Sequence, residues 1–248
     1  MADMKLYVLS VGWFMMNKGF VCARCKDADK RAKLPHLAYL IDHPKGKVLV
    51  DLGQSYEMRD ENTVMEPTDS VVHQLSLLGY RPEDIDYVVL THMHLDHVGY
   101  MNEFKNATFI VRKEELKAAW WPEACEGGYV WPLFKDTRFF KYIQPADGED
   151  YDIFMDGSIV LFDTQGHSRG HQSVALNLPE SGKLVIVGDA CPLLEGLDSN
   201  LLPGTCTDNW AAIRALDKLR HMEACGYKLL FAHDPDNLPE KLAPDFYA

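Results

Sequence analysis

The chain has 248 residues, of which 47% are hydrophobic and 11% aromatic, and its formal net charge is -12. This length and composition predict a folded domain with a sizeable core and exclude collagen-like and disordered chains. A surface of that charge repels phosphate backbones, so we expect no nucleic-acid partner. No stretch of the sequence approaches the roughly 20 apolar residues that cross a bilayer, so we expect no membrane partner.

The six cysteines are scattered along the chain, a distribution that favours reduced thiols in the cytoplasm over a disulfide framework. The N-terminal segment carries neither the basic region nor the small-residue cleavage site of a secretory signal. Cys22 and Cys25 form a C-x-x-C pair, a spacing compatible with metal binding or redox chemistry. Because no second pair lies nearby, ordinary thiols are the favoured interpretation.

Strand-like and helical segments alternate along the chain. Alternating polarity and short apolar runs predict strands at 5–9, 37–41, 47–51, 86–90, 109–112, 158–163, 173–178, 183–187 and 228–231. Helical spacing of apolar residues predicts helices at 70–78, 113–121 and 209–225. The segment 120–150 is rich in aromatic residues, Gly and Pro, and we expect an irregular insertion there. Since no linker separates the halves, the pattern favours one domain, 1–248, built as a layered α/β sandwich.

Four candidate metal ligands follow the predicted strand 86–90 within six residues: His92, His94, Asp96 and His97. In an extended stretch alternate side chains point the same way, so His92 and His94 can bind one ion together. Asp96 and His97, at the turn that follows, offer an oxygen and a nitrogen to a second ion. Clustering four such groups without a ligand would be costly, because buried polar groups need partners.

Three further candidate ligands, His167, Asp189 and His233, each come shortly after a later predicted strand. This is where α/β sheets place their chemistry. With the first cluster they make five histidines and two carboxylates, enough for two ions with one shared ligand. Two neighbouring divalent ions lower the pKa of a bridging water and so supply hydroxide for attack on a carbonyl or phosphoryl centre. The sequence therefore predicts a metal-dependent hydrolase.

These motifs resemble a known family. HMHLDH at 92–97, GHSRGH at 166–171, GDA at 188–190 and the late His233 resemble the metallo-β-lactamase superfamily of dinuclear hydrolases. Within it, the segment 78–85 is similar to the N-acyl homoserine lactonase group. The resemblance implies a four-layer αβ/βα sandwich, the metallo-β-lactamase fold. It also implies a small-molecule lactone as substrate, an N-acyl homoserine lactone or a related one, whose hydrolysis would quench quorum sensing.

The resemblance also implies roles for individual residues. It implies His92, His94 and His167 as ligands of one metal, Asp96, His97 and His233 as ligands of the other, and Asp189 as the bridge. The metals of this family are most often zinc, although nitrogen and oxygen donors also accept iron, manganese or cobalt. Asp96 would also pass a proton to the leaving alkoxide as a general acid and base. Asp51 resembles the family's aspartate that orients a metal-bound imidazole, with capping of the turn at Gly53 as the alternative. His171 is expected to be structural.

The sequence departs from the family around the substrate. Pro192 stands where many members carry a tyrosine. Only 25 residues separate Gly53 from Gly79, whereas acyl homoserine lactonases have a longer segment here that helps to clamp the acyl chain. The apolar residues that would line a substrate pocket, with core packing as the alternative, are Phe14, Met15, Met16 and Leu95.

Other functions and contacts stay open at this stage. A glyoxalase-II-like thioesterase or a phosphodiesterase would use the same ligands, and a non-catalytic metal-binding protein of this fold is a further alternative. In the insertion, Trp121 and Trp131 are expected either in the contact of a homodimer or in a substrate lid.

Overall fold

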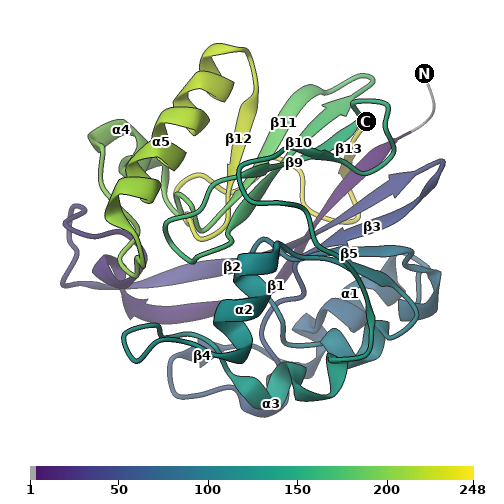
Figure 1. Ribbon diagram of the computed structural model, residues 1–248, viewed down its shortest axis with the longest axis horizontal. Helices are drawn as coiled ribbons and strands as arrows, with labels where there is room; N and C mark the ends of the chain where they lie inside the picture. The colour runs from purple at the N-terminus through teal and green to yellow at the C-terminus, as the bar shows by residue number, and fades with distance from the viewer. Residues whose placement is uncertain (1–3) are drawn as a thin grey trace.

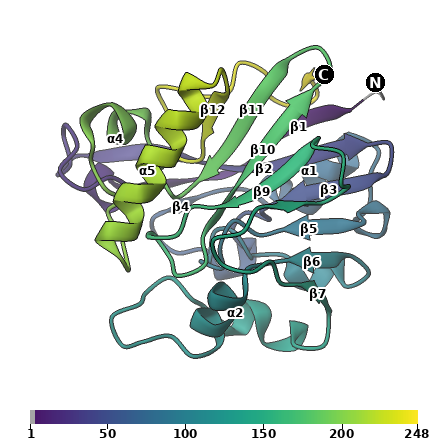
Figure 2. The same cartoon turned by 45° about the horizontal axis from the view of Figure 1, so that its top comes forward.

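The computed structural model describes residues 4–248 and shows two β-sheets packed face to face, with helices on their outer surfaces (Figure 1). The first sheet contains, in spatial order, β13 (Phe246–Tyr247), β1 (Lys5–Asn17), β2 (Arg31–His43), β3 (Gly46–Val50), β5 (Tyr87–Val89), β6 (Thr108–Ile110) and β7 (Lys141–Ile143), with β4 (Thr63–Val64) paired to β1. From β3 to β7 neighbouring strands are parallel, and Figure 2 shows them side by side.

The second sheet contains, in spatial order, β12 (Lys228–Phe231), β11 (Gly182–Gly188), β10 (Gln172–Leu178), β9 (Ile159–Asp163) and β8 (Tyr151–Asp152). The helices of the first half are α1 (Val71–Leu77), α2 (Lys113–Trp120) and α3 (Trp131–Phe134), and those of the second half are α4 (Leu194–Ser199) and α5 (Asn209–Ala224). Single 3-10 turns cover Lys18–Phe20, Tyr56–Met58, Pro67–Asp69, Pro82–Asp84, Met101–Phe104 and Lys135–Thr137. None of the helices in the described part of the chain has the length and apolar character needed to span a membrane.

Three apolar layers hold these elements together. Between the sheets, Val8 and Ile41 of the first sheet pack in one cluster with Val174 and Ile186 of the second. A second cluster lies between the first sheet and α1 to α3, and a third between the second sheet and α4 and α5, where Leu216 is buried. The order of layers is therefore helix, sheet, sheet, helix, which confirms the predicted αβ/βα sandwich.

Each predicted strand and helix is present, but two expectations need correction. The prediction of an irregular segment at 120–150 is wrong in part, because α3 and the edge strand β7 lie within it. The first strand runs to Asn17 instead of ending at Leu9. Its register shifts between Ser10 and Trp13, where Gly12 has a φ of +117°. A bulge of this kind interrupts the alternation of side chains on which sequence-based prediction relies.

The cysteines are free thiols, as the sequence suggested, and Cys22 and Cys25 are buried. Both pack with Leu193 in a small apolar cluster beside α4. Trp121 and Trp131 are exposed. Exposure is compatible with a dimer contact and with a substrate lid, and both stay predictions.

Candidate metal centre

The seven candidate ligands come together at one edge of the molecule. The segment 91–97 follows β5 in the first sheet, while His167, Asp189 and His233 follow β9, β11 and β12 in the second. The centre therefore lies across the interface of the two sheets. Asp96 is the most exposed of the seven side chains, at 11%.

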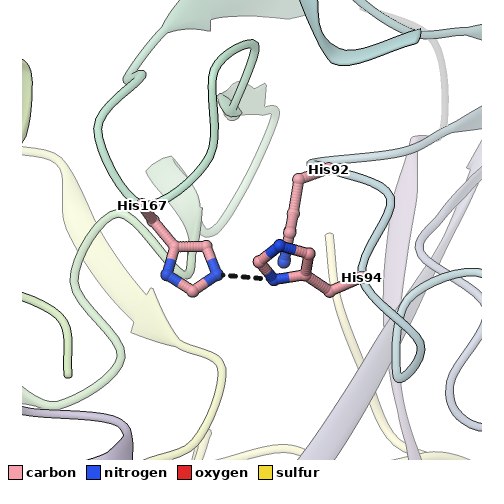
Figure 3. Close-up of side chains that lie close together, drawn as sticks. All are labelled: His92, His94 and His167. Carbon is pink, nitrogen blue, oxygen red and sulfur yellow. Dashed lines mark hydrogen bonds between the residues drawn. The ribbon is translucent and has the colours of Figure 1, made fainter. Parts of the chain in front are cut away.

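The first group of donors consists of His92, His94 and His167. One nitrogen from each lies within 4.8 Å of the others, and Figure 3 shows the three imidazoles converging. His94 Nδ1 and His167 Nε2 are 3.0 Å apart. The opposite nitrogen of His167 donates to the carbonyl oxygen of Thr205 at 2.8 Å, which holds Nε2 toward the centre.

The second group surrounds the carboxylate of Asp96. Its Oδ2 lies 3.5 Å from His97 Nε2 and 3.5 Å from His233 Nε2. Asp189 Oδ1 approaches the same two nitrogens, at 3.6 Å from His97 and 3.1 Å from His233. The other oxygen of Asp189 lies 3.6 Å from His167 Nε2 in the first group. Asp189 thus presents one oxygen to each group, which is the placement of a bridging carboxylate.

Asp51 holds the imidazole of His97 from outside the centre. Its Oδ2 accepts a hydrogen bond from His97 Nδ1 at 2.8 Å, so His97 Nε2 points inward. The carboxylate also accepts the amide and the hydroxyl of Thr91, both at 2.8 Å. These contacts place Asp51 where an orienting residue would act, whereas the alternative of a cap at Gly53 has no hydrogen bond to support it. His233 is held in the same way, by its Nδ1 donating to the carbonyl of Pro35 at 2.7 Å.

His171 is buried beside the centre, but both of its nitrogens are in use. Its Nε2 accepts the backbone amide of Asp189 at 2.9 Å, and its Nδ1 donates to the hydroxyl of Thr164 at 2.9 Å. Neither nitrogen has a lone pair free for an ion. This arrangement agrees with the expectation that His171 is structural.

The protonation states suit cation binding. Burial lowers the pKa of His92 well below its ordinary value and that of His94 to about 3, so both imidazoles are neutral at pH 7. Burial also acts to lower the pKa of His97 and His233, but Asp96 and Asp51 raise the pKa of His97 overall, and Asp189 and Asp96 raise that of His233. A metal that binds these two imidazoles would displace their protons.

The donor set fits divalent metal ions. Three buried atoms that face the centre have no hydrogen-bond partner in the described part of the chain: His92 Nε2, His97 Nε2 and Asp189 Oδ1. Leaving such groups unsatisfied costs on the order of 1–3 kcal/mol each, which a bound cation would recover. Imidazole nitrogen and carboxylate oxygen together suit zinc, iron, manganese and cobalt.

Two buried polar residues of the centre are not among the residues predicted from the sequence. Glu115 of α2 is fully buried and accepts hydrogen bonds from the amides of Met93 and Gly170 and from the hydroxyls of Ser168 and Tyr129. The other missed residue is His36 of β2, whose Nε2 lies 4.0 Å from Asp96 Oδ2. A helical pattern was available for Glu115, because Ala118 and Ala119 share its buried face. His36 has no comparable pattern.

A cavity of about 300 Å³ opens beside both groups of donors. Its apolar lining includes Phe14, Met16 and Leu95 but not Met15, and a part of these residues in substrate binding stays a prediction. Neighbouring residues of a strand face opposite sides, so Met15 points away when Phe14 and Met16 face the cavity. Pro192 lines the cavity, and residues 125–128 of the segment predicted as an insertion also border it.

Comparison with known proteins identifies the family. The sequence profile of the metallo-beta-lactamase superfamily matches residues 31–233. The chain belongs to this superfamily. It is 34% identical to the N-acyl homoserine lactonase AttM of Azorhizobium caulinodans and 32% identical to that of Agrobacterium fabrum, with 100% of each chain covered. A solved quorum-quenching N-acyl homoserine lactone lactonase superposes with a TM-score of 0.88 at 26% identity, covering 100% of this chain and 99% of the other.

Proposed function

We propose that this protein is a lactonase that uses two divalent metal ions, zinc in the first instance, to open the ring of an N-acyl homoserine lactone or a related lactone. The observation that carries the proposal is the pair of donor groups joined by the carboxylate of Asp189 beside an apolar cavity. The names of the full-length relatives support the choice of a lactone.

Each donor group would hold one ion. The proposed ligands are His92, His94 and His167 for the first ion, Asp96, His97 and His233 for the second, and Asp189 for both. Two ions bound there lower the pKa of water toward neutrality and polarise a carbonyl oxygen, which is the chemistry that ester hydrolysis needs. Asp51 would keep His97 in the tautomer that leaves Nε2 free to bind.

Asp96 has the position and the charge to move a proton. Burial alone would raise its pKa, but the neighbouring histidines, His97 first, hold the pKa below its ordinary value. The carboxylate is therefore ionised at pH 7 and lines the cavity. We propose that it accepts a proton during the attack and gives it to the alkoxide that leaves when the ring opens.

The cavity would hold the remainder of the substrate. Phe14, Met16 and Leu95 offer an apolar wall on which an acyl chain can pack without losing hydrogen bonds. Pro192 has no hydroxyl to contact the substrate carbonyl, so orientation of the carbonyl would depend on the ions.

Proton release on a panel of lactones tests this function. The panel contains N-acyl homoserine lactones of several chain lengths, aromatic lactones and small unsubstituted lactones, each with zinc-reconstituted protein. Asp189→Ala removes the bridge, and the matched control Asp198→Ala removes an exposed carboxylate on α4. We expect turnover that depends on acyl-chain length, is abolished in Asp189→Ala and is unchanged in Asp198→Ala.

Other outcomes would change the assignment in defined ways. Turnover confined to lactones without an acyl chain would keep the reaction and replace the substrate. A protein with two bound metals that hydrolyses none of the lactones would refute the lactonase proposal. Thioesters and phosphodiesters would then be the next substrates to test, and silence toward those as well would favour a metal-binding protein without activity.

A further inference from the structure

His36 lies against the second group of donors although it belongs to none of the metal-binding motifs. It comes from β2, in the sequence Leu34-Pro35-His36-Leu37, and its side chain is 1% exposed. The ring of Phe14 packs edge-on against it with centroids 4.0 Å apart, and the ring of His233 follows at 5.6 Å. Its Nε2 is 4.0 Å from Asp96 Oδ2.

Neither nitrogen of His36 has a hydrogen-bond partner among residues 4–248. A buried polar group in that condition costs on the order of 1–3 kcal/mol, so an apolar side chain would serve the packing of β2 better. Nε2 of the neighbouring His97, which faces the centre, also lacks a hydrogen-bond partner among the described residues, and a metal would be its partner. The same ion would be a partner for Nε2 of His36.

The distances allow His36 and Asp96 to share one ion. Two donors bound to the same ion at about 2.1 Å lie at most about 4.2 Å apart. The separation of 4.0 Å between His36 Nε2 and Asp96 Oδ2 falls within that limit. His36, Asp96 and His233 each offer one atom within 4.8 Å of the others, as do the three histidines of the first group.

We propose that His36 is a further ligand of the second metal ion. The proposal rests on the proposed function, which places an ion between Asp96, His97 and His233. With the shared Asp189, this ion would have five donors from the chain, three nitrogens and two oxygens. Zinc is most often bound by four ligands, so the extra imidazole favours an ion that accepts more, such as iron, manganese or cobalt.

Cobalt titration of the metal-free protein tests the assignment without using activity. The variant is His36→Leu, which fills a similar volume without a donor. The control is His43→Leu on the same strand, because His43 stacks on Phe154 and contacts Asp156, outside the metal centre. Competition with a chromophoric chelator gives the affinity of each ion, and the visible absorption of Co²⁺ reports its number of ligands.

We expect two bound Co²⁺ ions in the wild type and in His43→Leu. In His36→Leu the second ion should bind at least about tenfold more weakly and its visible band should intensify, as happens when cobalt loses a ligand. The first ion should be unaffected. Unfolding of metal-free His36→Leu should require as much denaturant as the wild type or more, because two unpartnered nitrogens are gone. If this variant folds poorly, His36→Phe provides the same comparison, because phenylalanine also has no donor atom.

An unchanged affinity and an unchanged cobalt spectrum in the folded variant would overturn the proposal. A changed rate of hydrolysis with both metal readouts unchanged would also overturn it, since His36 would then act on Asp96 and not on the ion. The outcome is separable from that of the proposed function. A wild-type protein that binds two ions but opens no lactone refutes the lactonase and leaves the cobalt result valid.

Discussion

Asp51→Asn is expected to weaken the second metal site while leaving the fold intact. One carboxylate oxygen of Asp51 accepts the Thr91 amide, and the other accepts the Thr91 hydroxyl and His97 Nδ1, all at 2.8 Å. Asparagine has the same shape. It also suits the backbone, because Asp51 has a φ of +57°, a left-handed conformation that asparagine tolerates as well as aspartate does. One oxygen, however, becomes an NH₂ group that can only donate.

The orientation of the new amide follows from what its neighbours can accept. The Thr91 amide can only donate, so the amide oxygen stays on that side and the NH₂ group faces the Thr91 hydroxyl and His97 Nδ1. His97 must then accept on Nδ1 and carry its proton on Nε2, which lies 3.5 Å from Asp96. A protonated Nε2 cannot bind a metal. Loss of such an orienting partner weakens metal binding about 10–100-fold, which corresponds to about 1.4–2.7 kcal/mol.

Chelator competition measures the affinity of the second ion, and denaturant unfolding of the metal-free variant measures stability. The matched control is Asp86→Asn. Asp86 lies at the end of β5 away from the metal centre, and its carboxylate accepts a hydrogen bond from the amide of Lys47 at 2.8 Å. The control should bind both ions as the wild type does. An Asp51→Asn protein whose second ion binds with wild-type affinity would refute the tautomer argument.

Three further predictions concern stability and thiols. Glu115→Gln leaves a buried backbone amide without an acceptor and should lower the free energy of unfolding by about 2 kcal/mol. Glu114→Gln, at the partly exposed neighbour, should lower it by about 0.5 kcal/mol. Equal losses in guanidinium unfolding would contradict the hydrogen-bond assignment. Burial raises the pKa of Cys22 to about 12, so at pH 8 a disulfide reagent should label the exposed Cys125 and Cys225 quickly and Cys22 only after unfolding. Fast labelling of Cys22 would contradict its burial. Removing the metals with a chelator should also lower the free energy of unfolding. For ions present at 100 times their dissociation constant the loss should be about 3 kcal/mol or more, and an unchanged denaturant-unfolding transition would contradict metal binding.

The fold was predictable where the periodicity of apolar residues continued through a whole element. The apolar run before Thr91 and the helix that starts at Asn209 were located to within two residues, because each keeps one period throughout. The second half of β1 was missed because the bulge near Gly12 reverses which side chains face inward. The edge strand β7, Lys141–Ile143, has three residues and no buried side chain, which is too little for a periodic signal.

The metal centre was predictable to the extent that its ligands follow strand ends in short motifs. His36 lies inside a strand, and its contact with Asp96 joins residues 60 positions apart, so no local spacing reports it. The helical spacing of Glu115 to Ala118 and Ala119 indicates its buried face, but its partners Ser168 and Gly170 lie 53 and 55 positions away along the chain. In both cases the missing information is a tertiary contact and not a property of the segment.

The contacts of the motif GHSRGH show structural roles that its sequence alone does not indicate. Only His167 faces the donors of the first group. Ser168 and Gly170 both donate hydrogen bonds to one oxygen of Glu115. Position 170 has no room for a side chain, because a Cβ atom there would lie 2.4 Å from the backbone nitrogen of Glu115. His171 accepts the amide of the bridging aspartate. One six-residue segment thus supplies a ligand, anchors it to α2 and holds the bridge. Substitutions of Ser168, Gly170 or His171 should therefore disturb metal binding as strongly as loss of an orienting residue does.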